Sequence, residues 1–427
     1  MLVDFAFGKT GLKTDLPDGF DYRLLEARSA APLPDWKAEL EAVLDRPVAG
    51  PSLAELARGK ASAAISVCDI TRPAPNRLIL PSVLSRLEAS GIPRSAIKIL
   101  IATGLHRPAT DAEIREIVGP EIAANYSVEN HYARNLDEHR SLGQTSTGTP
   151  VYIDERFVSA GIRLTLGFIE PHLMLGFSGG RKLVAPGLAA QETIKVLHSP
   201  KFMRDARTHE GSIEDNPLHR ELTEIAAMAG HSFMVDVALT RKREIAGIFA
   251  GAPIEAHRTG VHFVSQTLLE ELNEPVDAVI TTAAGYPLDL TFYQAVKGVT
   301  AAQHIVRPGG RILLIAACQE GSGAAEFSEM LKTAPGDEQF LEQITHTPVI
   351  VDQWQLEKLA MVTRKLDLLY YVPGLPADYY PALWGQAFSS EKEALTAFFE
   401  GLPPGAKVAV IPEGPYVLAK LQNTPLD

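Results

Sequence analysis

Two histidines and one lysine stand where a side chain could take part in proton transfer or covalent chemistry. His106 follows the apolar run AIKILIATG, His172 follows GIRLTLGFIE, and Lys182 ends the short segment SGGRK. Histidine exchanges a proton near neutral pH more readily than other side chains, so two histidines can supply an acid and a base on opposite sides of one substrate. A lysine beside glycines can supply a positive charge or a nucleophilic amine.

Each of these features also has a structural interpretation. A single histidine in a loop is more often a surface or capping residue, and SGGRK is either a tight turn with a solvated basic tip or a loop whose backbone N–H groups approach a phosphate. In DITRP, Asp69 and Arg72 form either a structural pair or a clamp for a phosphate or carboxylate. His198 fits a helix C-terminus, and Trp354 fits a core aromatic residue.

The surrounding elements follow an α/β pattern. β-Branched runs alternate with helical periods from Ala61 onward, which is typical of a largely parallel sheet. We predict strands over 61–69, 96–104 and 161–170 and helices over 76–90, 110–119 and 189–198, with Thr110 and Glu113 forming a capping box. Because ligands bind outside the carboxyl ends of parallel strands, one sheet edge is expected to gather the following residues: Asp69, Arg72, His106, His172 and Lys182.

A second α/β unit is predicted from about residue 272. It has a strand over 275–284, a helix over 290–306 and a strand over 311–318, without the G-x-G-x-x-G of a dinucleotide site. Gln294 and Lys297 are three residues apart and therefore share one helix face. We expect an N-terminal domain over 1–265, a C-terminal domain over 272–400, a long helix over 254–272 joining them, and a segment at about 404–427 that packs back on the N-terminal domain.

Composition restricts the class of protein. The 427 residues carry a formal net charge of −12, which argues against nucleic acid or an anionic membrane as the main partner. Apolar runs stay short of the roughly 18 residues that span a bilayer, and the start lacks a basic segment followed by an apolar one, so a cytoplasmic location is expected. Cys68 and Cys318 lie in apolar runs and are expected to be core thiols.

Metal-binding spacings are also missing. H-E-x-x-H, C-x-x-C and Walker A patterns do not occur, so any metal would need ligands that the protein does not supply. A zinc- or NAD-dependent protein that uses the same histidines is therefore disfavoured. A non-catalytic carrier or small-acid sensor is another class, but such a protein needs no acid/base pair.

Several segments together resemble the nickel-dependent lactate racemase family over nearly the whole chain. They are DITRPAP, ATGLHRPAT, GTPVYIDERFVSAGIRLTLGFIEPH, GFSGGRKLVAPG, GYPLDLTFYQAVKG and DQWQ. The resemblance implies two α/β domains with the active site in the cleft between them. It also implies a nickel-pincer nucleotide, pyridinium-3,5-bisthiocarboxylic acid mononucleotide nickel, attached covalently to Lys182 and loaded by cofactor-synthesis proteins.

The same resemblance implies a role for each candidate residue. His106 and His172 are the acid/base pair, and His198 is the metal ligand. The residues implied to bind the cofactor are Asp69, Thr71, Arg72, Ser178, Gly179 and Gly180. Those implied to bind substrate are Arg72, Tyr293, Gln294, Lys297 and Trp354. A planar S-C-S donor with one imidazole would give nickel a four-coordinate site without a protein cage.

The implied reaction is racemisation of a 2-hydroxy acid by hydride transfer. One histidine takes the hydroxyl proton while the Cα hydride moves to the pyridinium ring, which leaves a 2-keto acid that rotates and is reduced on its other face. Between His172 and the glycines the chain reads LMLGF, where the lactate enzyme is expected to have an aromatic residue and alanine beside the substrate. The expected substrate is therefore lactate or a larger 2-hydroxy acid.

Overall fold

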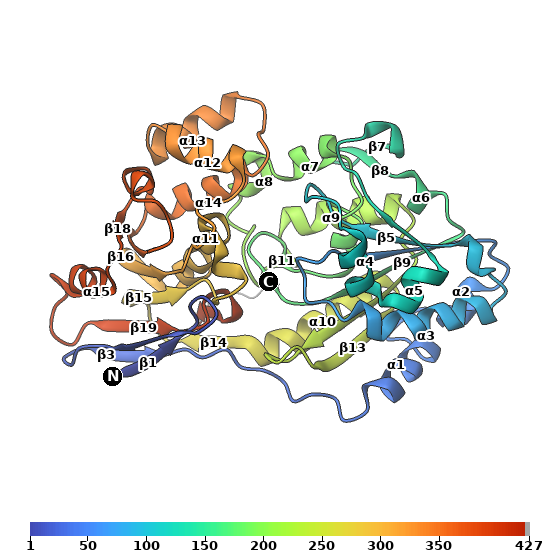
Figure 1. Cartoon of the computed structure of the whole chain (residues 1–427), viewed down its shortest axis with the longest axis horizontal. Helices are drawn as coiled ribbons and strands as arrows, with labels where there is room; N and C mark the ends of the chain where they lie inside the picture. Colours follow the sequence, from blue (N-terminus) through green and yellow to red (C-terminus); the bar gives the residue numbers. More distant parts are fainter. Residues whose placement is uncertain (423–427) are drawn as a thin grey trace. The chain divides into compact units, whose positions relative to one another are not determined.

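Two six-stranded sheets organise the chain, one in each of two units (Figure 1). The computed structural model describes residues 1–422. Unit 1 contains Met1–Arg28, His198–Ala206 and the chain from Leu268 onward, and unit 2 contains Ser29–Leu197 and Arg207–Thr267. The sequence thus predicted the class correctly, because both units are α/β with largely parallel sheets.

The sheet of unit 2 has the order β13-β12-β9-β4-β5-β6. All neighbours are parallel except β12 and β13. The strands are β4 (Ala63–Cys68), β5 (Ile97–Ala102), β6 (Ser127–Asn130), β9 (Ile162–Phe168), β12 (Phe233–Leu239) and β13 (Ile245–Gly251). β4, β5 and β9 are the three predicted strands, and they are adjacent in the sheet.

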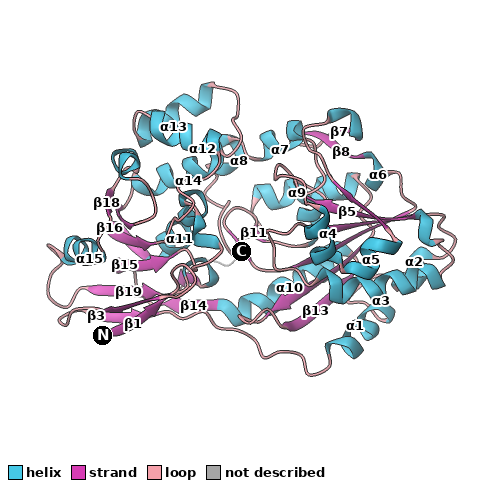
Figure 2. Ribbon diagram, in the orientation of Figure 1, coloured by secondary structure: helices cyan, strands magenta, loops and turns pink. Residues whose placement is uncertain are grey.

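Helices flank this sheet (Figure 2). The main ones are α1 (Trp36–Asp45), α3 (Asn76–Ala89), α4 (Asp111–Val118), α7 (Gln191–Leu197), α9 (Pro217–Met228) and α10 (Pro253–Leu268). The predicted capping box of α4 is confirmed, since the Thr110 side chain accepts from Glu113 N and the Glu113 side chain accepts from Thr110 N. Leu80, Val83 and Leu87 of α3 are buried against the strands.

The sheet of unit 1 is parallel throughout, in the order β18-β17-β16-β15-β19-β3. Its strands are β3 (Asp21–Leu24), β15 (Val276–Thr282), β16 (Val306–Ile315), β17 (Asp367–Tyr371), β18 (Gln386–Phe388) and β19 (Lys407–Ile411). The helices of this unit include α11 (Phe292–Ala302), α13 (Asp337–His346), α14 (Gln353–Thr363) and α15 (Glu391–Phe399). Strand–helix–strand β15-α11-β16 is the predicted crossover.

The boundaries of the units differ from the predicted domains. Residues 1–28 belong to unit 1 rather than to an N-terminal domain, because β3 pairs with β19. The segment that was expected to pack on the N-terminal domain instead supplies β19 to the unit 1 sheet, and its residues 423–427 lie outside the described part. The predicted helix over 254–272 ends at Leu268, since 269–272 form β14 (Leu269–Leu272) paired with β20 (Leu418–Leu421).

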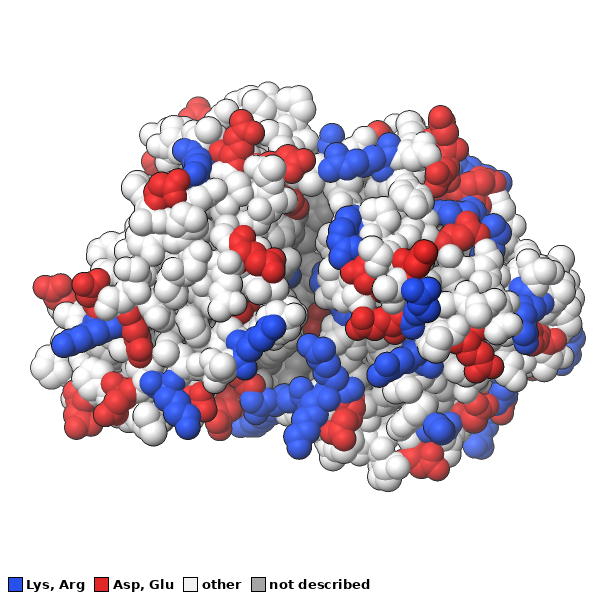
Figure 3. All heavy atoms as spheres, viewed as in Figure 1, with Lys and Arg blue, Asp and Glu red and all other residues white. Residues whose placement is uncertain are grey.

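Both cysteines are buried free thiols, as expected. On the face of unit 2 that Figure 3 presents, lysine and arginine are interspersed with aspartate and glutamate. Within residues 1–422, the helices are all too short or too polar to cross a membrane.

Candidate active site

Three adjacent strands of unit 2 bring the candidate residues of that unit to one sheet edge. Asp69 follows β4, and His106 lies four residues after the end of β5. His172 is in β10 (Pro171–His172), just after β9, and Lys182 is in the short helix η3 (Gly180–Leu183). Because β9, β4 and β5 are parallel neighbours, their carboxyl ends lie at one edge of the sheet, where Asp69 and His106 meet.

His106 and Asp69 form a hydrogen-bonded pair. His106 Nδ1 lies 2.7 Å from Asp69 Oδ2, and Thr71 Oγ1 donates to the same carboxylate at 2.7 Å. The Asp69 side chain is 7% exposed and that of His106 is 50% exposed. With a carboxylate at Nδ1, the neutral ring keeps its proton there, and Nε2 is the nitrogen that can accept a proton.

The charge of Asp69 is stabilised by its partners. Burial alone would raise its pKa, but the hydrogen bond and charge of His106, together with Arg72 and Thr71, lower the pKa below its ordinary value. Asp69 is therefore ionised at neutral pH and can stabilise an imidazolium at His106. The sequence implied a cofactor contact for Asp69, whereas the structure turns its carboxylate toward a predicted catalytic residue.

His172 is held by a two-stranded hairpin. β10 pairs with β11 (Gly176–Phe177), and His172 Nδ1 accepts from the backbone N–H groups of Met174 and Leu175, each at 3.4 Å. In the neutral ring the proton is then on Nε2. In their neutral forms, His172 and His106 thus have opposite tautomers. The intervening Leu173, Met174 and Leu175 side chains are buried, so they are packing residues in unit 2.

The turn before Lys182 is fixed by Asp236 of β12. Gly180 N–H donates to Asp236 Oδ2 at 2.7 Å, and a Cβ on Gly179 would lie 2.2 Å from that oxygen. Gly179 and Gly180 also have positive φ angles of 89° and 45°. The glycines are therefore required by a buried carboxylate, and their approach to a phosphate stays a prediction.

The Ser178 hydroxyl is also engaged with the backbone. It donates to the carbonyl of Phe168 and accepts from Glu170 N–H, both at 3.0 Å. Burial raises the pKa of Asp236 to about 7, although Gly180, Arg181 and Gly167 oppose the shift.

Lys182, Asp69 and Arg72 all lie close enough to the Cys68 thiol to shift its pKa. Burial raises the pKa of the Cys68 thiol; the charges of Asp69 and Asp236 raise it further, and Arg72 and Lys182 lower it. Arg72 also donates to the Thr71 carbonyl and hydroxyl at 3.3 Å. Asp69, Arg72 and Lys182 thus lie near Cys68, at the end of β4.

The remaining candidates belong to unit 1. Thr291 caps α11, and Lys297 Nζ donates to Gln294 Oε1 at 2.6 Å, which confirms that the two share a helix face. Tyr293 hydroxyl lies 3.0 Å from Asp352 Oδ1. Trp354 stacks on His198, with ring centroids 5.6 Å apart and an interplanar angle of 25°.

His198 is separated from Lys182 by the division into units. Residues 198–206, including α8 (Pro200–Met203), are grouped with α14 although they follow α7 directly in sequence. Arg204 Nε donates to Glu357 Oε1 at 2.7 Å, and Lys358 Nζ donates to the Met203 carbonyl at 2.8 Å. The structure therefore brings His198 together with Trp354, but does not bring it into the unit that holds Lys182.

Protein donors for a metal are few. Within the described residues, His, Cys, Asp and Glu side chains nowhere gather in a group of three or more that could hold a metal ion. A metal bound through His198 would need its other donors from a cofactor, so this donor set fits a group that carries its own sulfur and carbon ligands.

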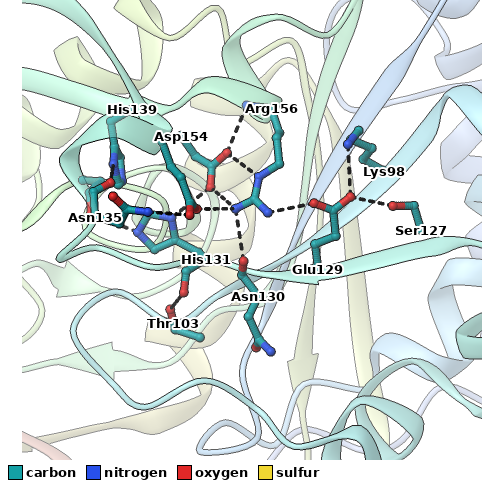
Figure 4. Close-up of polar contacts among 12 residues, drawn as sticks. Lys98, Thr103, Ser127, Glu129, Asn130, His131, Asn135, His139, Asp154 and Arg156 are labelled. Carbon is teal, nitrogen blue, oxygen red and sulfur yellow. Dashed lines mark hydrogen bonds and ion pairs between the residues drawn. The ribbon is translucent and has the colours of Figure 1, made fainter.

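A buried ionic network behind the His106 loop escaped the sequence analysis (Figure 4). His131 Nδ1 lies 3.0 Å from Asp154 Oδ2 and His131 Nε2 lies 3.0 Å from the Ala189 carbonyl, so both nitrogens face acceptors. Arg156 binds both oxygens of Asp154 at 2.9 and 2.6 Å. Burial would raise the Asp154 pKa, but Arg156 and His131 outweigh it and lower it.

This network reaches the candidate site through the backbone. Thr103, three residues before His106, donates to the His131 carbonyl at 2.8 Å, and Asp154 N–H donates to the Leu188 carbonyl at 2.9 Å. The signal that could have revealed Asp154 and Asp236 is an acidic residue inside an apolar, β-branched run.

Comparison with known proteins identifies the class of this fold and site. The model of the lactate racemase N-terminal domain matches residues 7–211, and that of the lactate racemase C-terminal domain matches 272–419. Lactate racemase of Lactiplantibacillus plantarum is 34% identical, and that of Thermoanaerobacterium thermosaccharolyticum 31% identical; each match covers 98% of this chain and 99% of the relative.

Comparison with solved structures supports the same family. The lactate racemase apoprotein from Thermoanaerobacterium thermosaccharolyticum superposes with a TM-score of 0.92 at 30% identity, covering 98% of this chain and 100% of that one. A Thermotoga maritima protein with a TM-score of 0.68 and 17% identity shares the fold; the match covers 92% of this chain and 100% of that one. The chain belongs to the lactate racemase family.

Proposed function

We propose that this protein racemises or epimerises a 2-hydroxy acid, lactate or a larger one. The observation that carries the proposal is the His106–Asp69 pair at 2.7 Å, in the same unit as His172 and Lys182, in a chain related along its whole length to lactate racemases. An ionised, buried carboxylate behind a half-exposed imidazole is the arrangement that general acid/base chemistry needs.

The two histidines act on the substrate hydroxyl. Asp69 holds His106 with Nε2 as the proton acceptor, whereas the hairpin amides at Nδ1 of His172 leave its proton on Nε2. One ring removes the hydroxyl proton of one enantiomer, and the other serves the opposite enantiomer. Each half-reaction begins with one ring neutral, as the base, and the other ring as an imidazolium, as the acid.

Lys182 is the proposed attachment point of a nickel-pincer nucleotide, which cofactor-synthesis proteins would load, and His198 is the proposed nickel ligand. When bound, this cofactor supplies a ring carbon that reversibly accepts the Cα hydrogen with its electron pair. Lys182 holds that ring through its amine, and Asp236 fixes the turn that carries Lys182. Thr71 and Arg72 lie beside Asp69, where they would contact the cofactor or substrate.

Lys297 is the proposed partner of the substrate carboxylate, because a desolvated anion needs a positive charge. Gln294 orients its ammonium group through the 2.6 Å hydrogen bond, and Tyr293 and Trp354 supply an aromatic surface. This assignment gives residues of both units a part in one reaction.

Isotope retention tests the proposed reaction. Protein produced with the cofactor-synthesis enzymes is given lactate, or a larger 2-hydroxy acid, deuterated at Cα. Hydrogen carried on a ring carbon does not exchange readily with water, whereas a protonated histidine exchanges at once. We expect racemised product to keep its deuterium in ordinary water. Washout at the rate of racemisation would exclude hydride transfer in favour of Cα deprotonation.

The Lys182→Ala variant is the matched control. It should fold, remain unmodified by intact mass and lack activity, because Lys182 is the attachment point. Racemisation by this variant would contradict the covalent cofactor. A carrier or sensor would bind the cofactor without any turnover, and it would have no need of the His106–Asp69 pair.

A further inference from the structure

A cavity of about 470 Å³ lies within unit 2, apart from the residues assigned to catalysis. It is lined by residues of α9, the first turns of α10 and the Arg181 side chain. Figure 1 labels the two helices. Arg181 directly precedes Lys182, yet it has no part in the proposed reaction.

Among residues 1–422, the buried cation Arg181 has no ion-pair partner. Its Nη1 lies 2.8 Å from His257 Nε2, which is also 2.8 Å from the Ser178 carbonyl. Its Nη2 donates to the carbonyls of Leu175 and Phe177 at 3.2 and 3.0 Å, and its Nε lacks a partner among the described residues. Burial lowers its pKa to about 9, and Asp236 opposes this only through its charge. A buried charge is costly unless paired, so this guanidinium favours a bound anion.

His219 of α9 adds a second unsatisfied group. Its Nδ1 is buried without a partner in the described structure, and its ring lies 5.9 Å from that of His257. Burial lowers the His219 pKa, and the positive charges of Arg181, Arg258 and Arg220 lower it further. The arginines thus give the cavity a positive potential, which a bound anion would reduce.

The rest of the lining selects the kind of anion. Ile213 and Ala226 are buried, and Ile254 is exposed at the rim, so an aliphatic chain has apolar surface to contact. Glu214 and Glu224 also line the cavity and would repel a dianion such as phosphate. Both are engaged elsewhere, since Glu214 pairs with Arg258 at 3.3 Å and Glu224 accepts from Ser146 N–H at 2.6 Å.

We propose that this cavity binds a small aliphatic monocarboxylate. The carboxylate group lies at Arg181 and His219, and the carbon chain packs against Ile213, Ala226 and Ile254. This site is independent of the proposed function, because it does not use Lys182, a histidine of the acid/base pair or any residue of unit 1.

Calorimetric titration with sodium butyrate tests the site. The protein is the full chain without cofactor and with Lys297→Ala, which removes the carboxylate partner proposed for the substrate. We expect one butyrate per chain, and an affinity at least about tenfold lower after His219→Phe, which removes a hydrogen-bonding group in a desolvated site. Ala227→Trp at the exposed rim should block binding to a similar extent without disturbing the core.

Thr259→Ala, on an exposed turn of α10 outside the lining, is the control and should bind as the parent does. Absence of butyrate binding would overturn the proposal. Equal affinity for chloride or inorganic phosphate would overturn the monocarboxylate class, and unchanged binding in both cavity variants would show that butyrate binds elsewhere.

Discussion

At the scale of single residues, three buried carboxylates of unit 2 hold neighbouring residues in position. Asp69 orients His106, Asp236 holds the turn before Lys182, and Asp154 anchors His131. Each is buried, and each has a different main partner: an imidazole for Asp69, a backbone amide for Asp236 and an arginine for Asp154. The candidate site therefore depends on carboxylates that position other residues and do not themselves take part in the proposed reaction.

Substitution of His106 by alanine should lower kcat at least about a hundredfold, because an acid/base group is lost. Asp69→Asn should lower kcat by at least about tenfold, since the amide no longer favours the imidazolium. The racemisation rate and the nickel content are measured for both variants. The nickel content should stay unchanged. Arg107→Ala, an exposed neighbour of His106 paired with Glu113, is the control; a similar loss there would indicate general disruption of the loop.

Asp236→Asn should change how stability depends on pH. The folded pKa of about 7 lies above the ordinary 3.8, so the protonated form is favoured on folding, and the associated stability is lost as pH rises from about 4 to about 7. The wild type should lose stability relative to Asp236→Asn over this window, by on the order of 4 kcal/mol at most. Urea unfolding at several pH values measures the difference, and parallel curves for the two proteins would contradict the assignment.

At the scale of elements, the segment after α7 is held by α14. Arg204 and Glu357 form an ion pair in which the glutamate is fully buried, and Lys358 binds the Met203 carbonyl. Together with the stacking of Trp354 on His198, these contacts explain why 198–206 belongs to unit 1. Helix α14 and residues 198–206 are thus expected to behave as one structural element.

Glu357→Gln should lower the free energy of unfolding by about 1–3 kcal/mol, because the Arg204 charge loses its buried partner. The matched control is Glu338→Gln, whose pair with Arg364 is exposed on both sides, and it should change stability by less than about 0.5 kcal/mol. Denaturant unfolding of the two variants checks this. If both variants had equal effects, the Arg204–Glu357 pair would be no more than a surface interaction.

At the scale of the whole molecule, the candidate residues are divided between units whose strands come from distant parts of the sequence. Unit 1 combines Met1–Arg28 and His198–Ala206 with the chain from Leu268 onward. The proposed substrate partner Lys297 is in unit 1, and the proposed acid/base pair is in unit 2. The proposal thus assigns roles to residues of each unit.

Lys297→Ala should raise the KM for the 2-hydroxy acid at least about tenfold, because the carboxylate loses its charge partner. Steady-state kinetics at saturating and limiting substrate measure this. Lys332→Ala removes an exposed lysine paired with Asp378 in the same unit and should leave KM and kcat as they are. An unchanged KM and kcat for Lys297→Ala would refute its assignment.

The sequence by itself determined the local elements and their class. The 3.6-residue period of α3, the capping box of α4 and the β-branched runs of β4, β5 and β9 are local properties, so their positions could be predicted. The sheet edge that gathers Asp69 and His106 also followed, because parallel strands with helical crossovers have few possible orders.

Only the tertiary structure decided which distant segments meet. The pairing of β3 with β19, the attachment of 198–206 to α14 and the approach of Asp236 to Gly180 join residues 56 or more positions apart. Such contacts leave no periodic signal in the chain, because a single buried hydrogen bond or ion pair constrains only the two residues that form it. The strands and helices could be predicted from nearby residues, whereas the groups that hold the site in place could not.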